Sequence, residues 1–334
     1  MRGPAKLSVY NIGATLRNLS AFMVNDGQAG HAAPTTDDLK GRIASFMRDA
    51  STEITPAEEN RLPELKSVLP GGTGVYVAHT PHASFGQVIR AALAVQRAGF
   101  HATPHIAVRR VPDSQTLRAA LQELRAGGVE HILLIAGDAP RPVGEFSGTV
   151  DVLHSRILEE SGINQISVAG HPEGHSAVPT SVLWEALRAK QAFAARSGLA
   201  MQIVTQFGLN AGAFRAWQRE LARRQIRLPV RLGIAGPAPI AKLLHFAIQC
   251  GVGASLRGLV RTVGAAARAP ELATTPDQHL LGVARTPVAA QIVAPHFFAF
   301  GGALETARWM QWVTAGKFEI DAKAARFRIQ GRDP

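Results

Sequence analysis

The sequence predicts an α/β fold, a (β/α)8 TIM barrel with an N-terminal helical extension. Short apolar, β-branched runs alternate with amphipathic segments of helical length over about 250 residues, which is the usual size of such a barrel. The glycine fingerprint G-x-G-x-x-G, typical of a doubly wound nucleotide-binding sheet, follows no early strand: Gly251 and Gly253 are followed by Leu256 and come after a helix. The alternation of strand and helix segments, without this fingerprint, therefore favours a closed barrel over an open sheet.

Eight segments have the composition of buried strands, namely residues 52–55, 74–79, 105–109, 131–137, 165–170, 201–207, 230–235 and 295–300. Helices are expected between and after them, at residues 84–98, 113–126, 149–160, 180–197, 210–225, 237–250 and 303–314. Asp113 and Asn210 occupy N-cap positions, and glycines such as Gly127 and Gly198 stand where helices should end.

Three regions follow from this pattern. Residues 1–50 are expected to form a helical arm, with a helical piece at 39–48 after a stretch rich in Gly, Ala, Pro and Thr. Residues 51–315 form the barrel, interrupted before its last strand by an extra helical piece at 255–267 and an irregular loop. Residues 316–334 are expected to be a C-terminal tail.

Composition excludes several classes of protein. Hydrophobic residues make up 46% of the 334 and charged residues 18%, so the chain is not disordered over most of its length. Its apolar runs are shorter than the roughly 18 residues of a membrane span. The single cysteine, Cys250, fits core packing in a reducing compartment, and we expect a cytoplasmic protein. The net charge of +11 is scattered, which favours steering of an anionic ligand over nucleic-acid binding.

Polar side chains gather at the predicted carboxyl ends of the strands, where barrels carry their chemistry. These residues are Glu53, His79, His82, His105, Arg109, Asp138, His171, Glu173, His175 and Gln206. Other catalytic classes lack their motifs, because the chain contains neither the G-x-S-x-G of a serine hydrolase nor the G-x4-G-K-[ST] of a P-loop.

Each of these residues also has a structural interpretation. Asp138 is a ligand for a heterocycle or a turn aspartate before Pro140. His171 and His175 anchor a cofactor or are ordinary loop histidines, and Pro172 and Gly174 argue against the helix that a two-histidine metal site would need. No metal is expected. Gln206 offers a donor and an acceptor to a ring edge, or bonds a neighbouring strand.

Five motifs, in this order along the chain, resemble the methylenetetrahydrofolate reductases, which are flavin-bearing (β/α)8 barrels. They are Ser51-Thr-Glu-Ile-Thr-Pro56, Pro104-His105, Gly137-Asp-Ala-Pro140, Val168-Ala-Gly-His-Pro-Glu-Gly-His175 and Thr205-Gln-Phe207, and the later Gly233-Ile234, Pro239-Ile240 and His296-Phe-Phe298 fit the same family. The resemblance covers about residues 51–315, and the motifs occur in the order of the predicted strands.

The resemblance implies reduction of 5,10-methylenetetrahydrofolate to 5-methyltetrahydrofolate, with hydride passing from NAD(P)H through FAD. It implies that Glu53 protonates N10 and that Asp138 lies near flavin and pterin. It makes Gln206 and Phe207 substrate contacts. The cofactor positions that it implies are His105, Gly137, Asp138, Gly170, His171 and His175, with Arg188 and Lys190 as diphosphate partners.

The chain departs from the family pattern at several flavin-contacting positions. Ala78-His79 replaces Thr-Tyr at the end of the second predicted strand, Ala136 replaces the arginine before Gly-Asp, and His171 replaces an aromatic residue. A flavin-free reductase, and a folate-binding or methyl-transferring barrel without reductase activity, therefore stay open. We also expect a homo-oligomer, while the choice between NADH and NADPH is left undecided.

Overall fold

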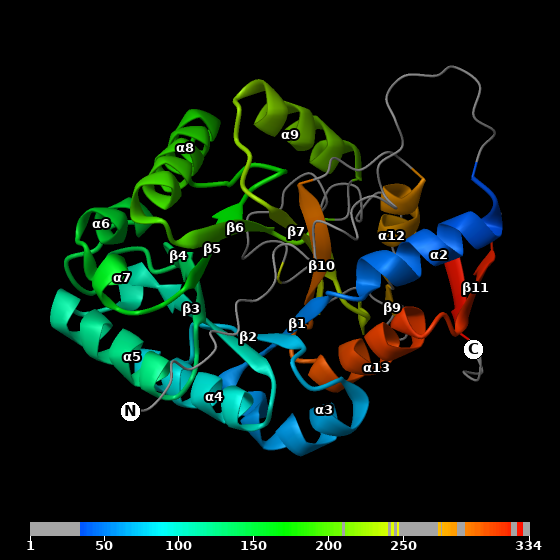
Figure 1. The fold of residues 1–334 in the computed structure, drawn as a ribbon, viewed down its shortest axis with the longest axis horizontal. Helices are drawn as coiled ribbons and strands as arrows, with labels where there is room; N and C mark the ends of the chain where they lie inside the picture. Colours follow the sequence, from blue (N-terminus) through cyan, green and yellow to red (C-terminus); the bar gives the residue numbers. More distant parts are fainter. Residues whose placement is uncertain are drawn as a thin grey trace, which may run out of the picture.

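The computed structural model confirms the predicted barrel. It describes residues 34–208, 211–239, 242–243, 246, 273–274, 276–285, 291–321 and 326–329. Within this part of the chain, eight strands close into a barrel in the order β1-β10-β7-β6-β5-β4-β3-β2, and every neighbouring pair is parallel. Helices surround the strands (Figure 1). Because all eight strands run in one direction, their carboxyl ends meet at one mouth.

The barrel strands are β1 (Ser51–Ile54), β2 (Gly74–Val77), β3 (His101–Ala107), β4 (His131–Ile135), β5 (Gln165–Gly170), β6 (Ala200–Thr205), β7 (Val230–Ala235) and β10 (Ile292–Phe298). A small antiparallel sheet pairs β8 (Ala238–Pro239) with β9 (Ala273–Thr274). In the closed order β5 lies opposite β1, four strands away in either direction.

The helices that follow the strands are η2 (Pro56–Arg61) with α3 (Leu62–Val68), α4 (Phe85–Arg97), η3 (Val108–Arg110), α5 (Ser114–Ala126), α6 (Thr149–His154), α7 (Ile157–Glu160), α8 (Thr180–Ser197), α9 (Ala211–Arg223), α12 (Asp277–Ala284) and α13 (Ala303–Thr314). Asp113 caps α5 as predicted, with its carboxylate accepting the Thr116 N–H at 2.6 Å. Gly198 ends α8 with a left-handed φ of 72°.

Three elements differ from the sequence prediction. Strand β3 begins at His101 and ends at Ala107, so Arg109 lies in a 3-10 turn instead of a strand. Pro104 inside this segment hid its first half, because proline is rare within strands. The helix expected at 149–160 breaks into two at Arg156, whose φ is +62°. The helices between β1 and β2 were not predicted, since prolines and charged residues obscure their apolar face.

Alternation along the strands divides the packing into two layers. One face of each strand packs under the helices in the main core, with side chains such as Ile54, Val75 and Ile106. The other face fills the barrel, where Tyr76, Leu133 and Val204 form a small apolar cluster of their own. Much of the remaining interior is polar, which is unusual in a barrel normally filled by branched aliphatic residues.

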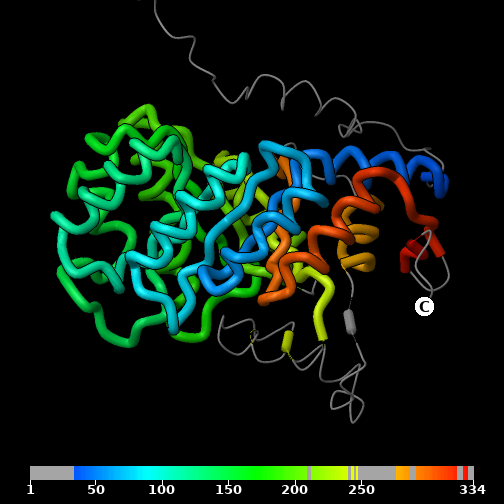
Figure 2. Tube along the Cα trace, turned by 90° about the horizontal axis from the view of Figure 1, so that it is seen from below, coloured from blue at the N-terminus to red at the C-terminus, as the bar shows by residue number. Residues whose placement is uncertain are grey.

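The two ends of the described chain meet on one side of the barrel. Helix α2 (Thr36–Met47) contacts α13, α12 and β10, and its Thr35 forms a capping box with Asp38. The predicted tail contains an antiparallel hairpin, β11 (Phe318–Asp321) with β12 (Arg326–Ile329). Figure 2 shows α2 and this hairpin at the same end of the molecule. Phe318 and Phe327 are both buried, so the hairpin is packed against the body of the protein.

Some sequence predictions fall on residues outside the described ranges. These are most of the arm at residues 1–50, the N-cap Asn210, most of the helix at 237–250 with Cys250, and the extra piece at 255–267. Among the helices that the structure describes, none has the length and apolar character required to cross a membrane.

Candidate functional site

Glu53 lies inside the barrel mouth, near the end of β1, where the chain is about to leave the barrel. Its side chain is buried, and the backbone N–H groups of Ala299 and Phe300 donate hydrogen bonds to its carboxylate from the end of β10. Phe300 adopts a φ of +50°, a left-handed conformation that is costly for a bulky residue. The turn after β10 therefore holds strained backbone where its N–H groups meet Glu53.

Burial and a second carboxylate together keep Glu53 protonated. Burial raises the pKa of Glu53 from 4.5 to about 8, with a further contribution from the negative charge of Glu58. The two backbone hydrogen bonds act in the opposite direction. Glu58 is fixed nearby, since it accepts the Thr55 N–H at 2.9 Å and the Ala303 N–H of α13 at 3.3 Å. At neutral pH the carboxyl of Glu53 therefore keeps its proton.

Three other predicted side chains at the strand ends present polar atoms without partners in the described part of the chain, and one of these atoms is Nδ1 of His79 after β2. His105 on β3 is buried with its Nε2 unpaired, and Gln206 after β6 leaves both its amide oxygen and its amide nitrogen unpaired. Burial lowers the pKa of His105 to about 3, so its ring is neutral. Buried polar groups in proteins are nearly always hydrogen-bonded, and those that are not often face a ligand. The mouth therefore offers an unsatisfied amide and an imidazole to a ring edge.

Asp138, the carboxylate predicted after β4, lies at the rim of the mouth. Its side chain is about half exposed and pairs with Arg110, whose guanidinium lies 2.7 Å and 3.2 Å from Oδ1. Arg110 also donates to the Pro81 carbonyl, which ties the loops after β2 and β4 together. The predicted Arg109 has a structural role, because it donates to the Ala139, Pro140 and Ser147 carbonyls.

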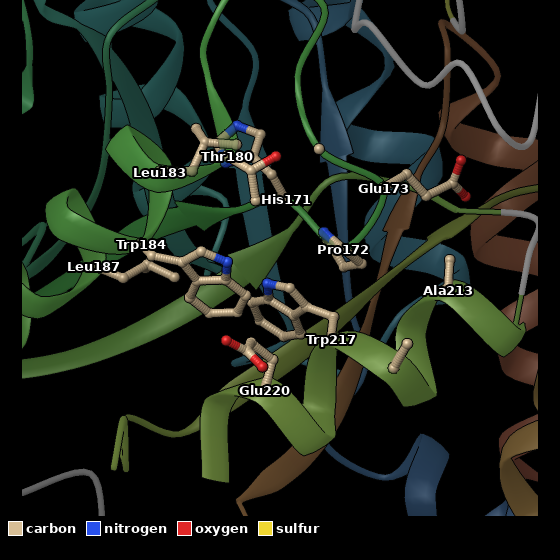
Figure 3. Close-up of a pocket in the computed structure, with 12 residues that line it drawn as sticks. His171, Pro172, Glu173, Thr180, Leu183, Trp184, Leu187, Ala213, Trp217 and Glu220 are labelled. Carbon is tan, nitrogen blue, oxygen red and sulfur yellow. The ribbon is translucent and has the colours of Figure 1, made fainter. Parts of the chain in front are cut away.

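A cleft of about 350 Å³ opens between α8, α9 and the loop after β5, across the barrel from Glu53. We call it the tryptophan cleft. Trp184 of α8 and Trp217 of α9 face each other there, with ring centroids 6.1 Å apart and an angle of 24° between the planes (Figure 3). The remaining lining residues are His171, Pro172, Glu173, Gly174, Thr180, Leu183, Leu187, Ala213, Ala216 and Glu220.

The predicted histidine pair lies at the edge of this cleft. The rings of His171 and His175 meet edge to face at 5.6 Å, and His175 Nδ1 accepts the Ala177 N–H. Burial, with the nearby charges of Lys190 and His175, lowers the pKa of His171 to about 3. Among the described residues no group of three potential ligands is arranged for a metal ion.

The two predicted diphosphate partners do not converge. Lys190 is on the buried face of α8, where burial lowers its pKa to about 8, whereas Arg188 is exposed. Residues two apart on a helix point to nearly opposite sides. These two cations therefore cannot both bind one diphosphate. Neither lines the tryptophan cleft.

The predicted glycines and Phe207 have packing roles in this structure. A Cβ on Gly137 would lie 2.9 Å from the Cβ of Ala107, and its φ is +89°. A Cβ on Gly170 would lie 2.5 Å from Ile203 and 3.1 Å from Trp217. Phe207 is almost fully buried between Phe298 and Phe300, which leaves little of its surface for a substrate.

Several residues of the site were missed at the sequence level. Arg110 was treated as scattered surface charge, and Glu58 had no assigned role. The backbone of Ala299 and Phe300 carries no sequence signal at all, because any residue supplies an N–H group. Trp184 and Trp217 could have been noticed as tryptophans on successive predicted helices, facing the same groove.

The fold and the site together define a (β/α)8-barrel protein with a polar mouth and a buried carboxyl of raised pKa. The sequence of residues 60–253, more than half of the chain, matches the family model described as methylenetetrahydrofolate reductase. The chain belongs to this family, as the motifs predicted. The matched segment runs from η2 past β7, so it includes Asp138, His171 and Gln206 and begins just after Glu53.

Solved structures with similar folds have low sequence identity. Dihydropteroate synthase (FolP) from Thermus thermophilus is 14% identical with a TM-score of 0.40, over 77% of this chain and 91% of that one. A protein from Burkholderia cenocepacia assigned as a phosphonomutase is 9% identical with a TM-score of 0.43, over 79% and 93%. The barrel itself is established by the strand order described above.

Proposed function

We propose that this protein reduces 5,10-methylenetetrahydrofolate to 5-methyltetrahydrofolate with NAD(P)H as the source of hydride and FAD as its carrier. Membership of the family supports a folate-related reductase. The observation that carries the specific reaction is the buried carboxyl of Glu53, whose raised pKa keeps a proton available at neutral pH. Opening the five-membered ring of the substrate needs a proton on N10 before hydride can reach the one-carbon unit.

The polar residues of the mouth are suited to hold a pterin with its N10 at Glu53. The unpaired amide of Gln206 matches the alternating donors and acceptors of a pterin edge. His105 stays neutral, so it does not repel a cation that develops when the ring opens. Asp138 adds a negative charge at the rim. Glu53 gives its proton to N10, and the N–H groups of Ala299 and Phe300 then stabilise the carboxylate that is left.

The tryptophan cleft fits the aromatic part of FAD. Its two indole rings, with His171 at the edge, form a site for a flat ring such as adenine. When bound, FAD accepts hydride from NAD(P)H and delivers it to the activated substrate. His171, Trp184 and Trp217 would hold the cofactor on the side of the mouth opposite Glu53.

A second candidate, direct hydride transfer from NAD(P)H without flavin, is favoured by the charges of this cleft. Its described lining includes Glu173 and Glu220 but no lysine or arginine. The cations beside it, Arg223 and Arg224, are paired with Glu220, and Arg224 also lies over the ring of Trp184. Lys190 and Arg188, the predicted diphosphate partners, lie on opposite sides of α8. A dinucleotide diphosphate would therefore meet arginines that are already paired with Glu220.

Two measurements on the full-length protein test these proposals. Purified protein is assayed for NADH or NADPH oxidation that depends on 5,10-methylenetetrahydrofolate, with 5-methyltetrahydrofolate identified as product. Its visible spectrum is recorded as isolated and after addition of FAD, followed by thermal unfolding to detect stabilisation by bound cofactor. Turnover with a flavin spectrum supports the first proposal, and turnover in colourless protein supports the second. Folate binding without any turnover contradicts both and leaves a folate-binding barrel.

A further inference from the structure

A second cleft, of about 520 Å³, opens beside β1 and β2, on the opposite side of the mouth from the tryptophan cleft. We call it the arginine cleft. It lies between the turn that follows β1, the loop that follows β2 and helix α4. Its lining residues are Thr55, Pro56, Ala57, Glu59, Thr80, Pro81, His82, Ala83, Gln87, Arg90 and Phe246.

The arginine cleft begins next to the proton donor. Thr55 and Pro56, two of its lining residues, come directly after the strand that carries Glu53. Phe246, another lining residue, packs on the ring of Phe300 with centroids 4.9 Å apart. The backbone N–H of Phe300 in turn donates to Glu53. A molecule with its reacting atom at Glu53 can therefore extend into this cleft.

The walls and the charges of the cleft suit different parts of a ligand. Pro56, Pro81 and Phe246 provide flat apolar surface. Arg90, on the exposed side of α4, has no hydrogen-bond or ion-pair partner among the described residues, so its guanidinium is available to an anion. Glu59 lines the same cleft, and its negative charge repels an anionic ligand there.

Folate has this sequence of groups from N10 outward. N10 is bonded directly to a flat benzoyl ring, and the ring carries a glutamate with two carboxylates. We propose that the arginine cleft binds the aminobenzoylglutamate tail of the substrate, with the benzoyl ring between Pro56, Pro81 and Phe246 and a glutamate carboxylate on Arg90. This inference rests on the proposed function, because it takes N10 to lie at Glu53. It also places the tail of the substrate and the adenine end of the cofactor in clefts on opposite sides of the mouth, which leaves the mouth itself for the pterin and the flavin.

Equilibrium binding tests the proposal without requiring turnover. Binding of 5-methyltetrahydrofolate and of 6-methyltetrahydropterin, which lacks the tail, is compared for the full-length protein and for Arg90→Ala, Arg90→Lys and Glu59→Gln. Arg90→Ala should raise the Kd for the folate about 10-fold, as expected for one lost charged hydrogen bond, and leave the pterin Kd unchanged. Arg90→Lys should recover part of the loss, and Glu59→Gln should tighten folate binding about 2-fold.

Arg97→Ala is the matched control, since Arg97 is an exposed arginine in the last turn of the same helix and does not line the cleft. It should leave both Kd values unchanged. Wild-type binding of folate with no effect of Arg90→Ala or Glu59→Gln overturns the tail site and leaves the proposed function intact. A loss of NAD(P)H affinity in Arg90→Ala, with folate binding unchanged, also overturns it and assigns the cleft to a dinucleotide phosphate. Absence of any folate binding by the wild type overturns both.

Discussion

The barrel contains two polar regions that differ in one respect, the pairing of their hydrogen-bonding groups. Deep in the barrel, Ser167 Oγ contacts His131 Nε2 at 2.8 Å, Gln202 Nε2 at 3.0 Å and Tyr76 OH at 3.2 Å, while His131 Nδ1 contacts Thr103 at 3.2 Å. We call these five residues the interior network. At the mouth, His105 Nε2 and both amide atoms of Gln206 have no partner in the described chain.

The difference teaches how to distinguish a structural polar group from a functional one inside the same barrel. Both regions are buried, and burial lowers the pKa of His131 and of His105 alike, to about 3. Burial and pKa therefore do not separate them. Hydrogen-bond satisfaction does, because a paired network stabilises the fold and an unpaired buried group costs free energy unless a ligand completes it.

The largest expected effect concerns the mouth. Glu53→Gln removes the transferable proton and should lower the rate of folate reduction by about 10²–10⁴-fold. NAD(P)H oxidation with an artificial acceptor should continue if flavin is bound. The variant is tested by steady-state turnover with 5,10-methylenetetrahydrofolate, and near-normal turnover would refute Glu53 as the acid.

The same variant should change how stability depends on pH. Folded protein holds the Glu53 proton up to about pH 8, whereas the unfolded chain releases it near 4.5. The folded state therefore binds more protons in this interval, and the free energy of unfolding of the wild type falls as pH rises through it. Glu53→Gln lacks this contribution, so urea unfolding at pH 5 and pH 8 should show the wild type losing its relative stability at the higher pH.

The most direct test of the comparison removes one polar group from each region and measures the change in the free energy of unfolding. Ser167→Ala leaves His131 Nε2 without its partner, while Gln202 Nε2 and the Tyr76 hydroxyl keep only their mutual contact at 3.4 Å. The change should lower the free energy of unfolding by about 1–3 kcal/mol. Gln206→Met removes an amide that is already unpaired and should leave stability unchanged or slightly raised, while folate affinity falls. Urea denaturation measures both. Equal destabilisation by the two changes would mean that the amide of Gln206 has hydrogen-bond partners in solution as well.

A smaller effect is expected from Glu58→Gln. Glu58 raises the pKa of Glu53 through its negative charge. The Thr55 and Ala303 N–H groups contact different oxygens of Glu58, so the amide keeps an acceptor for only one of them. The alkaline limb of the pH profile of kcat/KM should move to lower pH by a fraction of a pH unit, with little change in the plateau. Glu64→Gln, which removes an exposed charge on α3, is the control and should leave the profile in place. A limb that stays in place in Glu58→Gln would exclude Glu58 as a source of the raised pKa.

The smallest effect on stability is expected at the rim. Arg110→Gln breaks the partly exposed pair with Asp138 and should cost about 0–1 kcal/mol, measurable as a small fall in Tm. Asp138→Asn breaks the same pair, so it should also lower Tm only slightly. It should in addition change the rate of the reaction with folate. A large loss of stability in either variant would show that the pair holds the mouth together.

The sequence by itself determined the barrel, the identity of the strands and the location of Glu53, Asp138 and Gln206 at strand ends. These depend on local patterns, namely the alternation of apolar residues and the caps and glycines that end helices. The first half of β3 and the helices after β1 were missed where Pro104 and the charged turn at Pro56 disguised that local pattern.

Only the tertiary structure decided which polar groups are paired. Ser167 and Gln206 are both polar residues on or beside an apolar strand. The hydroxyl of Ser167 is the centre of a network, whereas the side-chain amide of Gln206 has no partner among the residues described. Arg110 reaches Asp138 over 28 positions, and the N–H groups that hold Glu53 come from the end of β10, far along the chain. Parallel strands bring such residues together only when the barrel closes, because the neighbours of β1 are β2 and β10. Hydrogen bonding at the site is a property of that closure and is absent from any local stretch of sequence.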